Sequence, residues 1–304
     1  MKPAFRAGAV HLRVPATSAN LGPGFDALGL ALSLHDDVVG RVGEDGLIID
    51  IAGEGADLPC DETHLVVRAM RRVFDELGGQ PRGIELSCAN RIPHSRGLGS
   101  SGAAIAAGVL LARSLVLGAE RALPDDELLA IASEIEGHPD NVSACLIGGL
   151  TIAWADESAA HAVGLNCDPA IWPVVLIPPF TASTEQARGL LPATVPHRDA
   201  AFAAGRAALL IAALTGSPEV LLAATEDRLH QQYRRPAMPQ SADLLAGLRA
   251  SGLAAVVSGA GPTVLVLARD DDEVARAASL APTEWTCLPL SVDTAGAHVV
   301  PAAR

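Results

Sequence analysis

Apolar residues along the chain follow two spacings, which divide it into strand-like and helix-like stretches. Alternating or short continuous apolar runs are typical of strands, and apolar residues three or four positions apart are typical of helices. The first spacing predicts strands that begin near residue 9 and at 46–53, 83–90, 170–180, 254–268 (two strands with a turn) and about 287–292. The second predicts helices at 64–79, 101–116, 124–137, 197–214, 241–252 and 271–280, while residues 141–155 pass from a helix start into a strand.

The order of these elements predicts the fold class. Strands and helices alternate throughout, which indicates two α/β layers packed side by side. The turn formers of PATSANLGPG, residues 15–24, predict that the first strand breaks there into a loop. The texture changes past Asp156 without a low-complexity linker, so we expect two domains, residues 1–160 and 161–304.

Composition narrows the class of protein. The 304 residues are 49% hydrophobic and 19% charged, which is typical of a folded globular chain. A formal charge of -13 argues against nucleic acid or an anionic membrane as a partner. The longest apolar run, residues 103–112, is too short to cross a bilayer, and no secretory signal is recognisable near the N-terminus. Five scattered cysteines predict buried free thiols rather than disulfides or a zinc site, and we expect a cytoplasmic protein.

A glycine-rich stretch, GLGSSG at residues 97–102, opens the predicted helix at 101–116. It matches the dinucleotide pattern G-x-G-x-x-G, but eight residues separate it from the preceding strand, and the nearest downstream acid, Glu120, lies in a loop. A Walker sequence is also absent. What remains is an anion site, because backbone N–H groups and the positive end of the helix dipole face the loop. The alternative is a glycine turn that only lets helices pack closely.

Two acidic residues stand at the wrong end of a helix. Gly137 and Pro139 predict that the helix at 124–137 ends there, which leaves Glu134 and Glu136 in its last turn. Carboxylates are disfavoured at a helix C-terminus unless a cation is near. Magnesium accepts a few oxygen ligands and bridges carboxylates to phosphates, so Ser101 and Glu136 are candidate ligands. The alternative is a pair of solvated surface acids.

Four segments then coincide with a known family. Residues 14–32, 92–104, 136–150 and 258–268 resemble, in this order, the signatures of the GHMP small-molecule kinases that act on L-homoserine. The resemblance spans residues 12–268 and includes 184–197 and 227–240 on the substrate side. It implies a two-domain GHMP-kinase fold of mixed α/β class, with a ribosomal-protein-like N-terminal nucleotide-binding domain and a ferredoxin-like C-terminal domain. It also implies phosphorylation of L-homoserine by ATP and Mg²⁺, on the route to threonine, with a homodimer as one expected assembly.

The same resemblance assigns roles to single residues. Asn20 and Asp26 match residues that hold the amino and hydroxyl ends of the substrate, and Ser101 and Glu136 match the magnesium ligands. The loop 258–261 matches a supporting segment over the substrate. The remaining substrate residues are His138, Thr184, Arg188 and Arg234; the supporting residues are Ser258, Gly259, Ala260 and Gly261; the nucleotide residues are His64, Pro93, His94, Ser95, Arg96, Gly97, Leu98, Gly99, Ser100, Ser101, Gly102 and Ala103.

The residue types suit this chemistry independently. A zwitterionic amino acid needs an anion for its ammonium, which Asp26 supplies, and a guanidinium fork for its carboxylate, which Arg188 or Arg234 supplies. Each arginine alone would be read as a surface charge. At His64 the family often has asparagine, so adenine binding is expected in altered geometry.

The catalytic positions depart from the wider family, in which several members use an aspartate base with a nearby lysine. Asn141 and Thr17 fall at those positions here, and an amide cannot accept a proton as a base. Asp140 is adjacent, but neighbouring side chains usually point apart. We therefore favour in-line transfer by positioning and charge neutralisation, with the hydroxyl proton passing to the phosphate.

Three other readings stay open. Another GHMP kinase, acting on a mevalonate-like or shikimate-like alcohol, would have no use for Asp26 as an ammonium partner. A non-catalytic ATP- or amino-acid-binding regulator need not retain Ser101 and Glu136. A dinucleotide-binding oxidoreductase is the weakest, because the glycine loop lacks its context.

Overall fold

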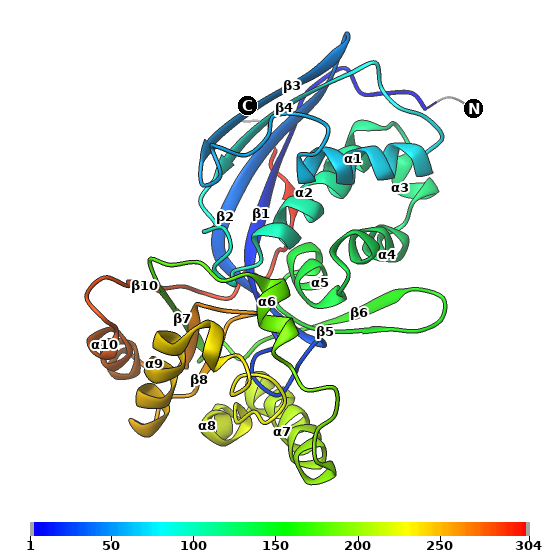
Figure 1. Cartoon of the computed structure of the whole chain (residues 1–304). Helices are drawn as coiled ribbons and strands as arrows, with labels where there is room; N and C mark the ends of the chain where they lie inside the picture. The colour runs from blue at the N-terminus through cyan, green and yellow to red at the C-terminus, as the bar shows by residue number, and fades with distance from the viewer. Residues whose placement is uncertain (1–2, 302–304) are drawn as a thin grey trace.

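A computed structural model describes residues 3–301 and contains two β-sheets flanked by helices (Figure 1). The larger, seven-stranded sheet has the order β11-β1-β2-β4-β3, with β5 added to β2 and β6 added to β5. Only β3 and β4 pair in parallel, and all other pairs are antiparallel. The strands are β1 Val10–Ala19, β2 Leu28–Gly43, β3 Gly46–Gly53, β4 Gly83–Asn90, β5 Leu150–Ala155, β6 Ala160–Leu165 and β11 His298–Val299.

Five helices, α1 to α5, lie on the side of the larger sheet, and α3 is a single short turn. The alanine-rich α2 lies between the sheet and its neighbouring helices, and small side chains such as Ala106 and Ala107 let them approach closely because both are fully buried. Gly108 makes the closest approach, since a Cβ there would collide with the backbone of Val66. The helices are α1 Leu65–Glu76, α2 Ser100–Leu115, α3 Ala119–Ala122, α4 Asp125–Glu136 and α5 Pro139–Ile147.

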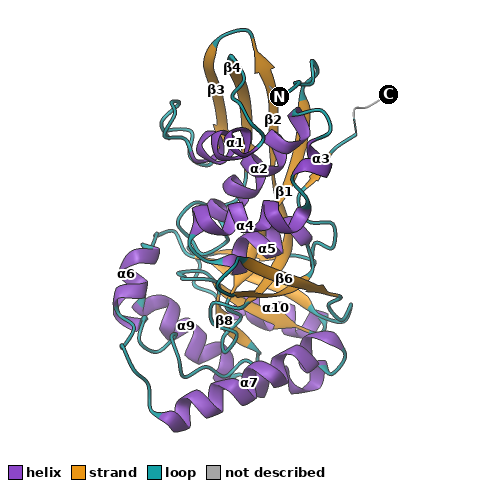
Figure 2. Cartoon of the chain, turned by 90° about the vertical axis from the view of Figure 1, so that its right-hand side faces the viewer, coloured by secondary structure: helices purple, strands orange, loops and turns teal. Residues whose placement is uncertain are grey.

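The smaller sheet has four antiparallel strands in the order β10-β7-β9-β8. Helices of the second half of the chain lie around it (Figure 2). Its strands are β7 Trp172–Ile177, β8 Ala255–Val257, β9 Val264–Ala268 and β10 Thr286–Pro289. The helices are α6 Thr184–Gly189, α7 His197–Thr215, α8 Leu221–Ala224, α9 Pro239–Ala250 and α10 Asp271–Leu280, with short 3-10 turns at Pro218–Val220 and Arg235–Ala237.

The predicted break at Pro15 is wrong, because β1 continues to Ala19. The strand tolerates the proline because the β1–β2 register shifts between Pro15 and Ala16, and a proline without an N–H is accepted at such a bulge. Beyond it, residues 16–19 pair with β2 and are fully buried. The chain turns only after Asn20, which has a φ of 69°.

Most other predicted elements are confirmed to within a few residues, and those at 46–53, 83–90 and 271–280 coincide with β3, β4 and α10. The strand β6 was not predicted, because its six residues are half-buried or exposed and show no clear apolar alternation. The helix α5 begins at Pro139, two residues before the predicted start.

One buried cluster joins the larger sheet to one face of the smaller sheet, and a separate cluster covers the other face of the smaller sheet. Leu12 of β1, Val175 of β7 and Leu265 of β9 belong to a single buried cluster. β6 remains in the larger sheet, and β11 returns to it after the smaller sheet is complete. The division at residue 160 stays a prediction.

The expectations for cysteines and membrane segments have mixed outcomes. All five cysteines are free; Cys88 and Cys145 are buried as predicted, but Cys60 is exposed. Burial raises the pKa of the Cys88 thiol to about 12, which makes it unreactive. Within residues 3–301, none of the helices has the length and apolar character needed to cross a bilayer.

Candidate active site

The glycine-rich loop before α2 forms one wall of a cavity. Ser95, Gly97 and Gly99 all have positive φ values, of 55°, 75° and 70°. A side chain on Gly97 would collide with the carbonyl of Ser258, and one on Gly99 would collide with Thr17 Oγ1. Glycine is therefore required at both positions by the close approach of other segments as well as by φ.

The first turn of α2 points free donors into this cavity. Gly99 is the N-cap and no side chain caps the helix, so the N–H groups of its first turn remain available to a ligand. Ser100 and Ser101 line the same cavity. This arrangement supplies an anion site at a helix N-terminus.

Ser101 and Glu136 meet across 35 residues of sequence, because the start of α2 faces the end of α4. The Ser101 hydroxyl donates to Glu136 Oε1 at 2.6 Å. Burial raises the pKa of Glu136 to about 7, partly offset by the Ser101 hydrogen bond, and the Asp140 carboxylate raises it further. A carboxylate in this position lacks a cationic partner among the described residues.

Thr17 and Asn141 also come together. Thr17 Oγ1 on β1 donates to Asn141 Oδ1 on α5 at 2.8 Å, directly behind Gly99. This contact fixes the amide so that its carbonyl oxygen is engaged with the protein.

The expectation that Asp140 points away from Asn141 is wrong. Asp140 Oδ1 accepts from the Asn141 backbone N–H at 2.7 Å and from Asn141 Nδ2 at 3.3 Å. It stands in the first turn of α5, where a carboxylate turns toward the unpaired N–H groups of the helix start. Asp140 lines the cavity at 2% exposure, and burial raises its pKa to about 6.

Opposite charges meet at the other end of the cavity, where Arg188 lines the wall and Asp26 pairs with it from behind. Asp26 accepts a two-pronged interaction from Arg188, with Nη2 2.6 Å from Oδ1 and Nη1 3.2 Å from Oδ2. The Asp26 N–H in turn donates to Asn20 Oδ1 at 2.9 Å. Both residues have positive φ, 69° for Asn20 and 55° for Asp26, so the turn holds the backbone in a strained conformation at these two positions.

Arg234 reaches the same place from the second half of the chain. Its Nη1 and the Asn20 amide Nδ2 both donate to the Gly259 carbonyl, each at 2.9 Å. Arg234 is 1% exposed, and burial lowers its pKa to about 10, with the Arg188 charge as the next cause. Its Nε and that of Arg188 have no hydrogen-bond partner within residues 3–301. A ligand carboxylate would satisfy such buried donors.

The supporting loop at 258–261 ties the two halves together. Ser258 Oγ donates to the Gly97 carbonyl at 2.6 Å, and it can accept from the Ser18 hydroxyl, whose Oγ lies 2.8 Å away. The Gly259 N–H donates to the Ala19 carbonyl at 3.1 Å. The loop after β8 is therefore fastened to both the phosphate-loop segment and the end of β1.

A second cavity continues from the phosphate loop. It has a volume of about 220 Å³, against about 160 Å³ for the first, and Ser95, Ser100 and Ser101 line both. His64 and His94 lie on its wall. Burial lowers the pKa of His64, so its imidazole is neutral at neutral pH, and its Nδ1 has no partner within the described chain. That nitrogen is a free hydrogen-bonding group for a planar base.

The structure gathers most of the predicted site residues around these two cavities, with some exceptions. The Arg96 guanidinium donates hydrogen bonds to the carbonyls of Pro178, Pro179 and His94, and the residue lines neither cavity. Leu98 is fully buried in the core. Pro93, Gly102, Thr17, Asp26, Ser258 and Gly261 also line neither cavity. The predicted residues that do line one are Asn20, His64, His94, Ser95, Gly97, Gly99, Ser100, Ser101, Ala103, Glu136, His138, Asn141, Thr184, Arg188, Arg234, Gly259 and Ala260.

Sequence reasoning missed a layer of residues under the site. Phe25 stacks on His230, with ring centroids 5.0 Å apart, and both Arg188 and Arg234 lie 5.6 Å from the Phe25 ring. Asp36, buried on β2, accepts from the backbone N–H groups that lead into the phosphate loop. An acid inside an apolar strand was the one available signal, in the stretch LHDDVV.

The chain is similar in sequence and in structure to known proteins of one family. Residues 64–149 match the GHMP kinases N terminal domain, and residues 200–284 match the GHMP kinases C terminal domain. The homoserine kinase of Streptomyces coelicolor is 61% identical over 99% of this chain and 97% of its own length. That of Clavibacter michiganensis subsp. michiganensis is 52% identical over 95% of this chain and 93% of its own. The crystal structure of homoserine kinase from Cytophaga hutchinsonii is 26% identical, with a TM-score of 0.86 and 98% of each chain covered.

The chain therefore belongs to the GHMP kinase family, and within it to the homoserine kinases. The predicted two-domain GHMP-kinase fold of mixed α/β class is confirmed, as is the assignment to a phosphotransferase. A dinucleotide-binding oxidoreductase is set aside.

Proposed function

We propose that the chain transfers the γ-phosphoryl group of ATP to the hydroxyl of L-homoserine, giving O-phospho-L-homoserine for threonine biosynthesis. One observation carries the proposal: a single cavity joins the phosphate-binding loop and Glu136 at one end to Arg188 and Arg234 at the other. Phosphate recognition and amino-acid recognition are thus adjacent, which an in-line transfer requires.

The amino-acid end suits a zwitterion. The substrate ammonium would take Asp26, and its carboxylate would take the unpartnered donors of Arg188 and Arg234. The ion pair between Asp26 and Arg188 would then break. Asp26 would pair with the substrate ammonium instead, and Arg188 with the substrate carboxylate. His138 and Thr184 line this part of the cavity, and burial lowers the pKa of His138, which favours a neutral hydrogen-bonding imidazole.

The nucleotide end suits ATP. The loop at 93–103 would hold the phosphates through its backbone N–H groups, and the 220 Å³ cavity beside His64 would take the adenine. Arg96 would act by anchoring the loop rather than by touching phosphate.

The residues also fit a magnesium ion. Glu136 is a half-buried carboxylate whose one hydrogen-bond partner within residues 3–301 is the Ser101 hydroxyl, and both are oxygen ligands of the kind that Mg²⁺ prefers. The described residues contain no cluster of three histidine, cysteine or acidic side chains, so phosphate and water oxygens would complete the coordination. When bound, the ion would neutralise charge on the transferring phosphate.

We propose positioning as the main source of rate enhancement. Asn141 is held by Thr17 and cannot act as a base, so it would orient the hydroxyl or a phosphate oxygen. Asp140 accepts hydrogen bonds from Asn141 and would keep that residue in place, with the hydroxyl proton passing to the phosphate.

ADP release from MgATP in the presence of L-homoserine tests the proposal, with mevalonate, shikimate and no acceptor as parallel reactions. Release with homoserine alone is the expected result. Release only with another alcohol would retain the kinase chemistry and overturn the roles of Asp26, Arg188 and Arg234. ATP binding without turnover on any acceptor would favour a regulator.

Three broader expectations remain proposals. We retain the division into domains 1–160 and 161–304, a homodimer, and a cytoplasmic location. The five free thiols support a reducing compartment. Light scattering of the purified protein tests the dimer.

A further inference from the structure

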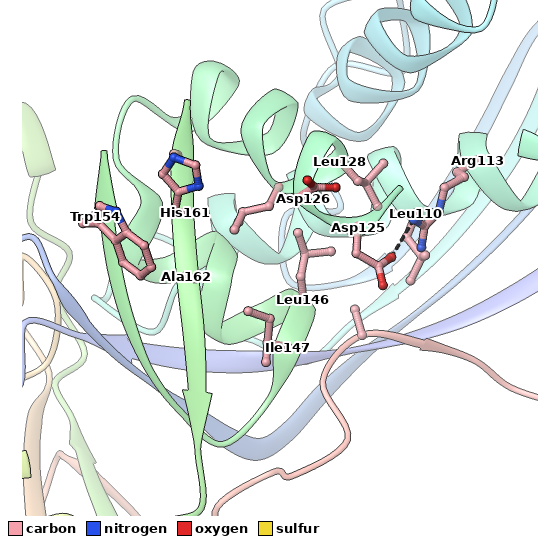
Figure 3. Close-up of a pocket in the computed structure, with 13 residues that line it drawn as sticks. Leu110, Arg113, Asp125, Asp126, Leu128, Leu146, Ile147, Trp154, His161 and Ala162 are labelled. Carbon is pink, nitrogen blue, oxygen red and sulfur yellow. Dashed lines mark hydrogen bonds and ion pairs between the residues drawn. The ribbon is translucent and has the colours of Figure 1, made fainter. Parts of the chain in front are cut away.

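The structure contains a further cavity that is separate from the site above. It has a volume of about 580 Å³ and lies between α2, α4, α5 and the β5–β6 hairpin (Figure 3). That volume is within the range of small-molecule pockets, and it exceeds that of either cavity of the candidate active site.

One part of this pocket is apolar. Leu110, Leu128, Leu146 and Ile147 come from three different helices and converge on it (Figure 3). Trp154 on β5 faces the same space at 48% exposure and stacks on His161 of β6, with ring centroids 5.3 Å apart. An apolar ligand body would cover this surface and remove it from water.

The other part carries charges of both signs. Arg113 donates through Nη1 to Asp125 at 2.6 Å and to the Leu123 carbonyl at 3.3 Å. Its Nε and Nη2 make no hydrogen bond with residues 3–301, so the outer edge of the guanidinium retains its donors. Asp126 lines the pocket next to Asp125 and forms no ion pair within the described chain.

These features select a zwitterion with an apolar side chain. An anion would face two carboxylates, and an uncharged apolar molecule would strip water from Asp126 and Arg113 without replacing it. We propose that this pocket binds an apolar α-amino acid, with its ammonium on Asp126, its carboxylate on Arg113 and its side chain against Leu128, Ile147 and Trp154.

The pocket is connected to the catalytic cavity by three helices. α2 runs from Ser101 to Leu110 and Arg113, α4 runs from Asp126 to Glu136, and α5 runs from Asn141 to Ile147. Each helix thus has one end in each cavity, and at 1.5 Å per residue the two ends are about 9 Å apart on α5 and about 15–18 Å apart on α4 and α2. An amino acid bound in this pocket would shift the three helices and with them Ser101, Glu136 and Asn141. The affinity of the protein for the amino acid and its affinity for the nucleotide are therefore coupled.

Calorimetric titration with L-leucine, L-isoleucine and L-phenylalanine tests the site, with saturating L-homoserine present to fill the substrate cavity. We expect one saturable event per chain, weakened at least about tenfold by Asp126→Asn because a charged hydrogen bond is lost. Glu127→Gln is the matched control, since Glu127 is the next acid in the same helical turn and does not line this pocket. L-leucinol and 4-methylpentanoate, which lack the carboxylate and the ammonium respectively, should each bind more weakly than L-leucine.

A non-hydrolysable ATP analogue completes the experiment, and the leucine dissociation constant should differ by at least about twofold in its presence. Equal dissociation constants would overturn the coupling. Binding that L-homoserine abolishes and Asp126→Asn leaves unchanged would belong to the substrate cavity and would overturn the site. Absence of binding, together with a Trp154→Ala variant that converts a dimer into monomers, would identify this surface as a contact between two copies and would also overturn it.

Discussion

Asp26 and Arg188 neutralise each other across 162 residues of sequence through a two-pronged pair at 2.6 and 3.2 Å. The sequence assigned them to opposite ends of the same substrate. In the structure they are partners, so each charge compensates the other. This arrangement favours a ligand that brings both a cation and an anion, because a ligand with one charge would leave the other partner unpaired.

Replacing the fork of Arg188 by a single ammonium should separate binding from turnover. In Arg188→Lys the charge remains but the two parallel hydrogen bonds do not. We expect the KM for L-homoserine to rise about tenfold to 100-fold, with a smaller change in kcat and in the KM for ATP. Steady-state kinetics with each substrate varied check this. An unchanged KM for homoserine would remove Arg188 from the substrate site.

Truncating Arg234 should also raise the KM for L-homoserine. The variant would lack the guanidinium proposed to bind the substrate carboxylate, and the Gly259 carbonyl would lose a hydrogen-bond donor. We expect a rise of at least about tenfold in Arg234→Ala. Arg235→Ala is the control: that side chain pairs with Asp243 on the surface at 2.6 Å, and its removal should leave both KM values unchanged. Similar KM values in the two variants would contradict the assignment.

Removing the charge of Glu136 should cost activity and increase stability. Its pKa of about 7 in the folded protein is above the unfolded value, so the folded protein holds the proton more tightly and loses stability as pH rises from about 4.5 to 7. Glu136→Gln removes that loss, which is on the order of 3 kcal/mol at pH 8 without metal. We expect a higher free energy of unfolding in urea, with kcat reduced about 100-fold. In Glu134→Gln, which changes an exposed acid two residues away, neither quantity should move.

Magnesium affinity should depend on the same proton. A ligand carboxylate must be ionised, so below the Glu136 pKa of about 7 the apparent dissociation constant for Mg²⁺ should rise about tenfold per pH unit. Above that pH it should level off. Titration of the protein with Mg²⁺ and an ATP analogue between pH 5.5 and 8.5 measures this dependence. The same titration of Glu136→Gln gives the part that arises from protonation of the analogue itself, and that part is subtracted. A flat dependence would show that Glu136 does not bind the ion.

A methyl group on Gly99 should disrupt the phosphate loop. Its Cβ would collide with Thr17 Oγ1 and would lie 3.1 Å from Asn141 Oδ1, and φ is 70°. We expect Gly99→Ala to lower the free energy of unfolding by about 1–3 kcal/mol and to weaken ATP binding strongly. Gly205→Ala on α7, where nothing lies within 4 Å, should instead be neutral or stabilising by up to about 1 kcal/mol. ATP affinity that remains normal in Gly99→Ala would contradict the proposed loop function.

The sequence predicted those parts of the molecule that depend on local pattern. The strands at 46–53 and 83–90 and the glycine loop before α2 follow from apolar spacing and turn chemistry. The continuation of β1 past Pro15 depends instead on a bulge against β2, and the existence of β6 depends on pairing with β5; neither partner is visible from a local window.

The site, too, has residues that local sequence pattern predicts and contacts that depend on tertiary packing. Ser101 and Glu136 could be named from a helix start and a helix end, but their 2.6 Å contact depends on how α2 and α4 pack. The contact between Asp140 and Asn141 could not be predicted from the rule that neighbouring side chains point apart, because in the first turn of α5 the Asp140 carboxylate turns back to the Asn141 N–H. Phe25 and His230 were not found, since an aromatic ring beneath two arginines has no signature in sequence.

The return of β11 to the edge of β1 also determines how the molecule would bear a mechanical load. Leu12 lies opposite Val299 in an antiparallel pair, and the whole smaller sheet is inserted between β6 and β11. A stretching force between Val10 and Val299 would act first on this short ladder, at one end, and would unzip it bond by bond. Until then the inserted sheet, with Arg234 and the loop at 258–261, would lie outside the path of the force and keep its shape.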